Sequence, residues 1–287
     1  MSTRRDFIKQ SSLLTAAFFL PNDVFFASKK QVGLQTYTLR STIMKDPKAV
    51  LAAVAKLGYK QIETFGYNEG KWFGLTVPEL KAVLKENGLT SPSGHTFGGG
   101  TFLKDGWEEK WKPAVADSKA LGQEFIVVPY LEDSFRSIDN YKKIAAALNK
   151  AGEIAKAGGS KLAYHNHDFE FKESEGQKGF DILVKDTDPN LVKFELDIYW
   201  AVKAGYDPIA LFKDNPGRIT MWHVKDIDKT EKKFFTEVGN GSIDWKSIFA
   251  AAKTSGMKYF FVEQDVTPGD PMQSIEKSIN YLKKNII

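Results

Sequence analysis

The feature that most constrains this chain is a pattern that recurs eight times from Gln31 onward. A short run rich in β-branched and aromatic residues is followed by a longer stretch whose apolar residues have helical spacing. The short runs occupy residues 31–39, 61–67, 91–97, 124–130, 161–167, 192–200, 219–227 and 259–265. Strands separated by helices pair in parallel through crossovers. Eight such units in about 260 residues predict a closed (β/α)8 barrel of the α/β class.

The competing architecture is an open, doubly wound parallel sheet. A dinucleotide-binding sheet of that kind carries G-x-G-x-x-G after its first strand, and "QVGLQTYTLR" (31–40) lacks that sequence. Neither a linker nor a low-complexity segment separates the eight units. The sequence therefore predicts one barrel domain, which we place at residues 28–287.

Polar residues gather where the predicted strands end. In a barrel of this type the active site is built at the carboxyl ends of the strands. All four histidines of the chain and three acidic residues fall there: Glu63, His95, His165, His167, Asp197, His223 and Glu263. Buried ionisable groups are costly unless they are paired or bound to a metal. So many in one place are hard to explain by packing alone.

The alternation of side chains along a strand sharpens this prediction. Residues two apart point to the same face of a strand. Four pairs are related in this way: His165 and His167, Glu195 and Asp197, His223 and Lys225, Glu263 and Asp265. If one member of a pair points into the mouth of the barrel, its partner does too.

The available ligands at the predicted site are carboxylates and imidazoles, with no thiols. Such ligands favour a divalent metal ion of intermediate or hard character. The chain has no cysteine, which excludes thiolate nucleophiles and Cys-type zinc sites. Mn²⁺, Mg²⁺, Co²⁺ and Zn²⁺ fit the remaining ligand types. The strongest candidates are Asp197, His223 and Glu263, with His165 as the fourth ligand. A structural hydrogen-bonding role is the alternative for each, and His167 is either a substrate contact or a group that holds a neighbour.

At this point the sequence resembles a known family, the sugar isomerases and epimerases with a xylose-isomerase-like barrel. The matching segments are "LDIYW" (196–200), "WHVKD" (222–226), "GNGSIDW" (239–245) and "VEQD" (262–265). The resemblance implies one divalent metal ion, held by Asp197, His223 and Glu263, that grips adjacent oxygens of a sugar. It also implies that a proton leaves the carbon beside the carbonyl and that the metal stabilises the resulting enediolate.

One position departs from the family pattern. Epimerases of the family carry a glutamate at the end of strand five, where this chain has His165 in "AYHNH". The form YHxH looks more like the inosose dehydratase branch and related keto-sugar lyases, which remove the same proton and then expel a leaving group. Glu263 is expected to be one base and His165 or His167 the other. For elimination, the acid would be His167, Lys225 or His95.

These observations lead to two enzymatic hypotheses and two weaker ones. The first is a metal-dependent isomerase or epimerase of a sugar or keto-sugar. The second is a dehydratase, lyase or hydratase that uses the same enolate. A sugar-binding protein without catalysis is less favoured because the ligand residues are intact. A DNA-repair endonuclease of the same fold binds three zinc ions and needs more ligands than this chain offers.

The predicted rim also suits a small carbohydrate. Glu63, His95, Lys225 and Trp200 are the predicted substrate contacts, and Tyr37, Phe65 and Trp222 also offer rings near the rim. The rim segments of strands two to eight contain no arginine, which disfavours a phosphorylated substrate. The net charge of +4 is mild and no block of lysine and arginine stands out, so we expect no nucleic-acid partner.

The first 27 residues read as a separate signal. Arg4 and Arg5 precede the apolar run "SSLLTAAFFLP" (11–21), which matches a twin-arginine export signal. We expect residues 1–27 to be removed and the enzyme to be exported, in the periplasm of a bacterium. No other segment is apolar for long enough to span a bilayer, so we expect no stable membrane insertion after the signal is removed.

Overall fold

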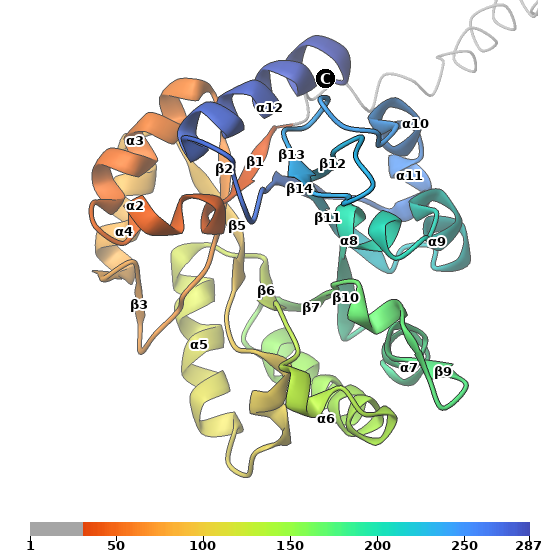
Figure 1. Cartoon of the computed structure of the whole chain (residues 1–287). Helices are drawn as coiled ribbons and strands as arrows, with labels where there is room; N and C mark the ends of the chain where they lie inside the picture. Colours follow the sequence, from red (N-terminus) through yellow and green to blue (C-terminus); the bar gives the residue numbers. More distant parts are fainter. Residues whose placement is uncertain (1–30) are drawn as a thin grey trace, which may run out of the picture. The chain divides into compact units, whose positions relative to one another are not determined.

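Eight parallel strands close into a barrel in the computed structural model, which describes residues 31–287 (Figure 1). The strands neighbour one another in the order β1-β14-β11-β10-β7-β6-β5-β2. Their bounds are β1 Gly33–Gln35, β2 Gln61–Thr64, β5 Thr90–His95, β6 Phe125–Val128, β7 Lys161–His165, β10 Val192–Asp197, β11 Ile219–Val224 and β14 Tyr259–Val262. The predicted single (β/α)8 barrel is confirmed. The predicted signal peptide lies outside the described residues.

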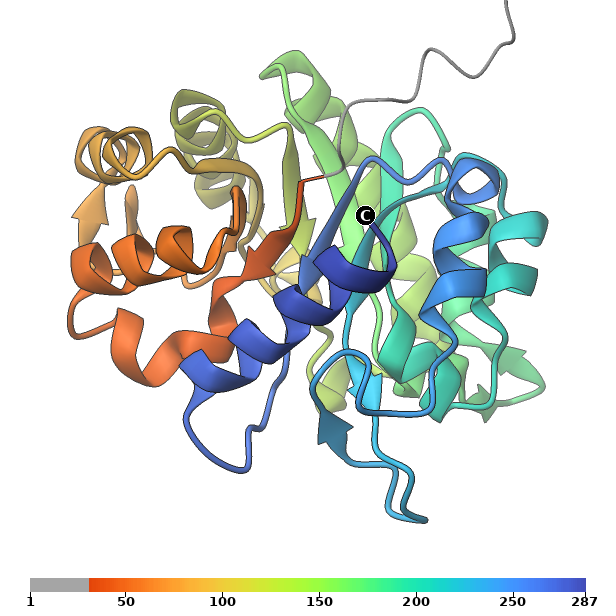
Figure 2. The ribbon, with the colours of Figure 1, turned by 90° about the horizontal axis from the view of Figure 1, so that it is seen from above.

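Helices surround the barrel (Figure 1), and the view turned by 90° shows α12 lying across its front (Figure 2). They are α2 Arg40–Ile43, α3 Pro47–Leu57, α4 Val77–Glu86, α5 Glu108–Leu121, α6 Ile138–Ala157, α7 Gly179–Asp186, α8 Ile198–Lys203, α9 Pro208–Asp214, α10 Trp245–Ala250, α11 Ala252–Ser255 and α12 Pro271–Asn285. Within residues 31–287, none of these helices combines the length and the apolar character that crossing a membrane requires.

Helix starts follow the local sequence. Thr76 and Glu79 form a capping box at the start of α4, with the Thr76 amide and hydroxyl both donating to Oε2 of Glu79. Asp46 caps α3 in a similar way by accepting from the amide of Ala49 at 3.0 Å. Such caps satisfy amides that have no partner inside the helix, so α3 and α4 can begin directly after the preceding loop.

The barrel interior is apolar at its base and polar at its mouth. The base is filled by a cluster of five buried side chains: Phe125, Val127, Ala163, Met221 and Phe261. Because side chains two apart share a face, the same inward rows continue with ionisable residues toward the carboxyl ends. The apolar base excludes water from below, so the polar groups can be reached only from the mouth.

Asp226 organises the loop that follows strand β11. Its carboxylate accepts the amides of Gly239 at 2.8 Å and Ile243 at 3.2 Å, and Nε1 of Trp245 at 2.9 Å. A Cβ at Gly241 would collide with the same carboxylate and with the carbonyl of Ile227. The motifs "WHVKD" and "GNGSIDW" are therefore two halves of one structural contact beside the mouth of the barrel.

Candidate active site

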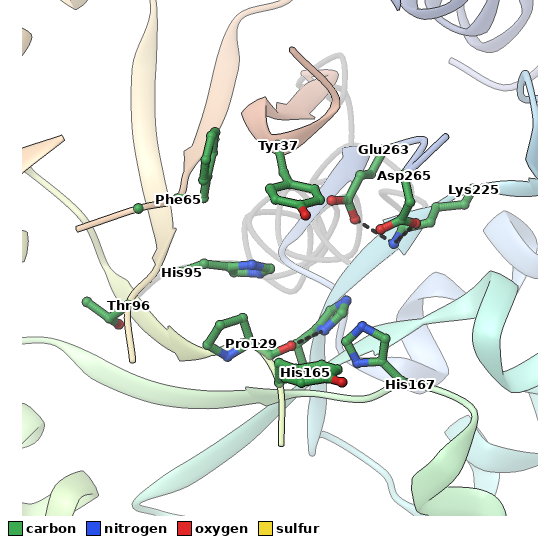
Figure 3. A pocket seen from close by; sticks show the side chains of 12 residues that line it. Tyr37, Phe65, His95, Thr96, Pro129, His165, His167, Lys225, Glu263 and Asp265 are labelled. Atoms are coloured by element: carbon green, nitrogen blue, oxygen red, sulfur yellow. Dashed lines mark hydrogen bonds and ion pairs between the residues drawn. The ribbon is translucent and has the colours of Figure 1, made fainter. Parts of the chain in front are cut away.

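A cavity of about 400 Å³ opens at the carboxyl ends of the strands (Figure 3). It is lined by Tyr37, Phe65, Gly66, His95, Thr96, Pro129, Tyr130, His165, His167, Lys225, Glu263 and Asp265. Five of these are predicted site residues. Aromatic rings form part of the wall, and Tyr37 and Phe65 meet edge to face with centroids 5.2 Å apart. A polar floor with aromatic sides is typical of sites for small polar ligands.

The four predicted metal ligands come together above the cavity floor. His165, Asp197, His223 and Glu263 end four neighbouring strands, and one donor atom from each lies within 4.8 Å of the other three. Nε2 of His165 is 3.2 Å from Oδ2 of Asp197. Nδ1 of His223 is 2.8 Å from Oε2 of Glu263. The structure thus assembles this predicted set, here called the donor set, while metal binding itself stays a prediction.

Two atoms of the donor set support the fit of a divalent ion. Nδ1 of His223 and Oε2 of Glu263 are buried and face each other at 2.8 Å without a hydrogen bond of acceptable geometry, so Nδ1 has no satisfactory partner, whereas Oε2 also pairs with Nζ of Lys225 at 2.6 Å. Unsatisfied polar atoms in a protein interior are costly and call for an explanation. Imidazole nitrogens and carboxylate oxygens suit Mn²⁺, Co²⁺ or Zn²⁺, and Mg²⁺ less well because it prefers oxygen alone. The donor set therefore fits the predicted metal chemistry.

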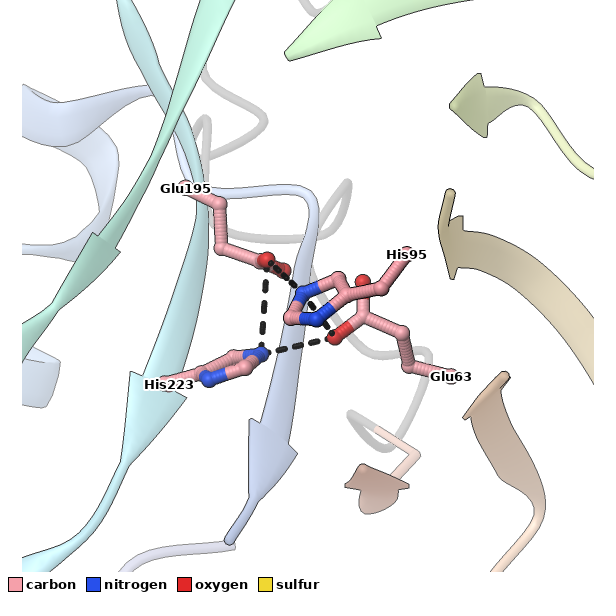
Figure 4. Close-up of side chains that lie close together, drawn as sticks. All are labelled: Glu63, His95, Glu195 and His223. Carbon is pink, nitrogen blue, oxygen red and sulfur yellow. Dashed lines mark hydrogen bonds and ion pairs between the residues drawn. The ribbon is translucent and has the colours of Figure 1, made fainter. Parts of the chain in front are cut away.

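A second group of side chains lies deeper in the barrel and is called here the lower cluster (Figure 4). It consists of Glu63, His95, Glu195 and His223, which are all buried. Nε2 of His223 is 2.7 Å from Oε2 of Glu63 and 3.3 Å from Oε2 of Glu195. Nε2 of His95 is 2.9 Å from Oε2 of Glu195, and its ring stacks on that of His223 with an interplanar angle of 18°.

The lower cluster has the ligand types of a metal site, but its hydrogen bonds favour a supporting role. Glu63 is also held by Gln35, which donates from Nε2 to Oε2 at 2.8 Å, and by Ser93, which donates from Oγ to Oε1 at 2.5 Å. When Nε2–H of His223 donates to Glu63, Nδ1 is the nitrogen that can exchange its proton for a metal. A carboxylate that orients a ligating histidine in this way raises metal affinity.

Burial and neighbouring charges set the protonation of the four rings. Burial lowers the pKa of His223, but the carboxylates of Glu195, Glu263 and Glu63 outweigh it and hold that pKa well above its usual value, so this ring carries a proton on both nitrogens in the metal-free protein. Burial lowers the pKa of His165 to about 4, with a further contribution from His223. Burial also holds the pKa of His167 well below its usual value. Burial lowers the pKa of His95 as well, but Glu63 and Glu195 outweigh it and raise the value to about 9. His165 and His167 are therefore neutral near pH 7 and carry a lone pair, whereas His95 holds a proton.

Lys225 lies among the carboxylates of the donor set. Its Nζ is 2.8 Å from Oδ2 of Asp197, 2.6 Å from Oε2 of Glu263 and 2.8 Å from Oδ2 of Asp265. The side chain is only 1% exposed. Lys225 lines the cavity as predicted, but its charge is already paired.

His167 faces the cavity from a turn that a buried glutamate holds. Its ring stacks on Phe169 with centroids 5.4 Å apart, and its Nδ1 is buried without a hydrogen-bond partner. Its backbone amide donates to Oε2 of Glu170 at 2.7 Å, and the hydroxyl of Tyr164 donates to Oε1 at 2.7 Å. Glu170 thus fixes the position of His167 at the cavity.

Some predicted contacts lie away from the cavity. Glu63 is fully buried beneath it, and the rings of Trp200 and His167 lie 5.5 Å apart without Trp200 joining the cavity wall. Substrate contact by Glu63 or Trp200 stays a prediction. Trp222 points outward, stacks on Phe212 and donates from Nε1 to Ser255, so its role is in the core.

Sequence reasoning left four functional-site residues without a role. Glu195 and Asp265 were identified as sharing a face with Asp197 and Glu263, and that shared face was the available signal. Gln35 and Glu170 gave no such signal, because each acts through a partner distant in the chain or through a turn.

Comparison with known proteins agrees with this geometry. A family model described as xylose isomerase-like TIM barrel matches residues 51–285. An inosose dehydratase from Clostridium perfringens is 29% identical over 165 residues, which are 51% of this chain and 55% of that protein. Another inosose dehydratase, from Lactiplantibacillus plantarum, is 26% identical over 181 residues, or 55% of this chain and 57% of the relative. The chain thus spans little more than half the length of these curated relatives.

Solved structures match over a greater length. A protein described as a sugar phosphate isomerase/epimerase from Parabacteroides distasonis has a TM-score of 0.78 and 28% identity, covering 90% of this chain and 99% of that one. The structure of 3-keto-D-glucoside 4-epimerase from E. coli has a TM-score of 0.69 and 17% identity, covering 89% and 100%. At that identity the second likeness supports the fold alone.

Proposed function

We propose that this chain, which belongs to the xylose isomerase-like TIM barrel family, is a divalent-metal-dependent isomerase or epimerase of a sugar or keto-sugar. The observation that carries the proposal is the donor set. Four ligand-type side chains from neighbouring strands meet within 4.8 Å beside the cavity. Relatives and neighbours whose names describe isomerases, epimerases and dehydratases of small carbohydrates support the same class of chemistry.

The donor set, His165, Asp197, His223 and Glu263, would hold the ion. When bound, a divalent ion supplies Lewis acidity, which polarises a carbonyl and favours loss of a proton from the adjacent carbon. The lower cluster keeps the His223 ring in place for that task.

The chain's own residues then move the proton. His167, which is neutral and lines the cavity, takes it from the carbon on one side of the substrate. Glu263 keeps a second carboxylate oxygen beside the one in the donor set. Once this oxygen has taken up a proton from solvent, it returns that proton from the other side, and His167 releases the proton it took to solvent. Epimerisation requires two such groups facing the same carbon, because the proton must leave from one face and come back on the other.

The proposed substrate is an unphosphorylated sugar. Among the described residues that line the cavity, Lys225 is the only lysine or arginine, and three carboxylates surround it. Phosphate recognition relies on cations or on backbone amides at helix starts. The rings of Tyr37 and Phe65 instead offer apolar faces on which a sugar packs.

A second candidate function is elimination, as in a dehydratase or keto-sugar lyase. The observation that favours it is His165, which stands where epimerases of the family carry a glutamate, together with relatives named inosose dehydratase. Elimination shares the first proton transfer and adds an acid that protonates the leaving oxygen. His95, which lines the cavity and holds a proton, is suited to that role.

A deuterium experiment tests the proposal and separates the two outcomes. The Mn²⁺-loaded protein is incubated in D₂O with a panel of keto-sugars and 3-keto-glycosides, and products are followed by NMR. Deuterium at the carbon beside the carbonyl, with a new stereoisomer, supports the isomerase or epimerase. Loss of water or of the aglycone supports the lyase. If the protein exchanges no proton in any panel member, or if Glu263→Gln exchanges as fast as the wild type, the enzymatic proposal fails.

A further inference from the structure

Negatively charged groups outnumber positively charged ones around Lys225 at the cavity. Three carboxylates, those of Asp197, Glu263 and Asp265, lie within 2.8 Å of one buried ammonium. Figure 3 shows two of them, Glu263 and Asp265, beside Lys225. Two of these carboxylates belong to the donor set, and the third does not. Lys225 therefore occupies the position of a cation in the site where a metal ion is proposed to bind.

An ion and the ammonium cannot share the same oxygens without strong repulsion. Oδ2 of Asp197 and Oε2 of Glu263 are the atoms that contact Nζ, and both also lie beside His165 or His223 of the donor set. Two cations within a few ångströms of each other in a protein interior repel steeply, because the surroundings screen them poorly. Binding of a divalent ion thus requires that Nζ leave these two oxygens.

Asp265 already contacts Nζ and can keep it when Nζ leaves the other two oxygens. It lies two residues after Glu263 on the same face, lines the cavity and is 24% exposed. With a divalent ion present, Asp197 and Glu263 would balance its two charges, and Asp265 would balance Lys225. Each cation then has its own carboxylate partners, and no buried charge is left unpaired.

We propose that Lys225 is a positioning residue that holds Asp197 and Glu263 together in the metal-free protein and that, when the ion binds, it releases both and keeps Asp265 as its partner. This inference rests on the metal site of the proposed function. Lys225 keeps the ligands assembled before loading and at the same time competes with the metal. Asp265 decides how readily Lys225 gives way.

Titration of chelator-treated full-length protein with Mn²⁺ in a calorimeter tests the proposal. Lys225→Met, which nearly keeps the length of the side chain but removes its charge, should bind Mn²⁺ about tenfold more tightly than the wild type. Without metal, this variant should also melt at a lower temperature than the wild type. Addition of Mn²⁺ should remove that difference. Asp265→Asn should bind Mn²⁺ several-fold more weakly, because Lys225 then has no partner of its own.

A matched control is Lys203→Met, which removes a lysine near Trp200 and Tyr199 that is not part of the donor set. It should bind Mn²⁺ as the wild type does. If the wild type binds Mn²⁺ and Lys225→Met binds it equally or less tightly, the competition is disproved while the metal site stands. Unchanged binding by Asp265→Asn contradicts the role of Asp265 as the retained partner, and this variant remains informative if Lys225→Met does not fold. If neither the wild type nor Lys225→Met binds Mn²⁺, the metal site itself is wrong and the inference falls with it.

Discussion

The ring of His223 joins two groups of carboxylates: Nε2 lies 2.7 Å from Oε2 of Glu63, and Nδ1 lies 2.8 Å from Oε2 of Glu263. One nitrogen is therefore directed to the lower cluster and the other to the donor set. In the metal-free protein the neighbouring carboxylates outweigh burial and hold the pKa of this ring well above its usual value, so both nitrogens carry a proton. A metal at the donor set would replace the proton on Nδ1, while the N–H on Nε2 would stay directed to Glu63. The deep carboxylate thus determines what the ring offers at the mouth of the barrel.

Glu63→Gln should weaken metal binding without touching the donor set. The variant keeps the size of the side chain but loses the charge that orients His223, so Mn²⁺ affinity should fall by about 10- to 100-fold. Calorimetric titration measures this. The same substitution at the opposite end of the barrel, Glu124→Gln, should leave affinity unchanged. Equal affinities for Glu63→Gln and the wild type would show that the lower cluster does not support the metal.

Removal of the metal should remove activity reversibly. Treatment with a chelator should abolish turnover of whichever keto-sugar proves to be a substrate, and Mn²⁺ should restore it, because the proton beside the carbonyl is not acidic enough without a Lewis acid. Asp197→Asn should bind no stoichiometric metal by elemental analysis while keeping its circular dichroism spectrum. Full activity after exhaustive chelation would rule out the metal-dependent mechanism.

His167→Asn should separate catalysis from metal binding. The ring is not in the donor set, so metal content should stay at the wild-type level. As the proposed proton carrier, its loss should lower kcat by about 10²- to 10⁴-fold while KM changes little. Steady-state kinetics and metal analysis on the same preparation check both points. A variant with a raised KM and an unchanged kcat would make His167 a binding residue instead.

Glu124 should make stability depend on pH at the base of the barrel. Burial raises its pKa, but hydrogen bonds from Lys258 and Lys161 outweigh it and lower the value to about 2 in the folded protein. Since the folded pKa lies below the unfolded value of 4.5, Glu124 stabilises the protein fully above pH 4.5, and this stabilisation is lost as pH falls toward 2.

Chemical denaturation of Glu124→Gln at several pH values measures that contribution. Because the side chain is partly exposed and solvent screens it, we expect the variant to be less stable by only about 1 kcal/mol at pH 7. The difference should shrink between pH 4.5 and 2 and should also shrink in high salt. A difference that grows as the pH falls would contradict the lowered pKa.

We also propose that residues 1–27 direct export through the twin-arginine pathway. Replacing both Arg4 and Arg5 by lysine should retain the protein in the cytoplasm of a bacterial host, whereas the unmodified chain should be found in the periplasmic fraction. If the unmodified chain and the double lysine variant were divided equally between cytoplasm and periplasm, the predicted export signal would be refuted.

The barrel and the donor set could be predicted because both depend on short-range regularities. The alternation of strand-like and helix-like runs specifies eight βα units, and right-handed crossovers leave few ways to join them. Each ligand residue lies at the end of a run, and parallel strands bring their carboxyl ends to one side. His165, Asp197, His223 and Glu263 could thus be placed together before any distance was known.

The lower cluster could not be predicted in the same way. Glu63 and His223 are 160 residues apart in the chain, and their contact crosses the inside of the barrel. Glu63 was predicted to contact the substrate because it too ends a strand. Its actual depth depends on how the strands are staggered, a property of the closed barrel that no local pattern records.

By itself, then, the sequence determined the repeated βα units, the apolar base and the set of ionisable residues at the strand ends, because these follow from side-chain periodicity. Only the tertiary structure decided which of those residues meet. It directed Nε2 of His223 toward Glu63, put Nζ of Lys225 between Asp197 and Glu263, and left the buried Nδ1 of His167 without a hydrogen-bond partner. These relationships depend on distances across a closed barrel, and electrostatic interactions in a dry interior change with every ångström.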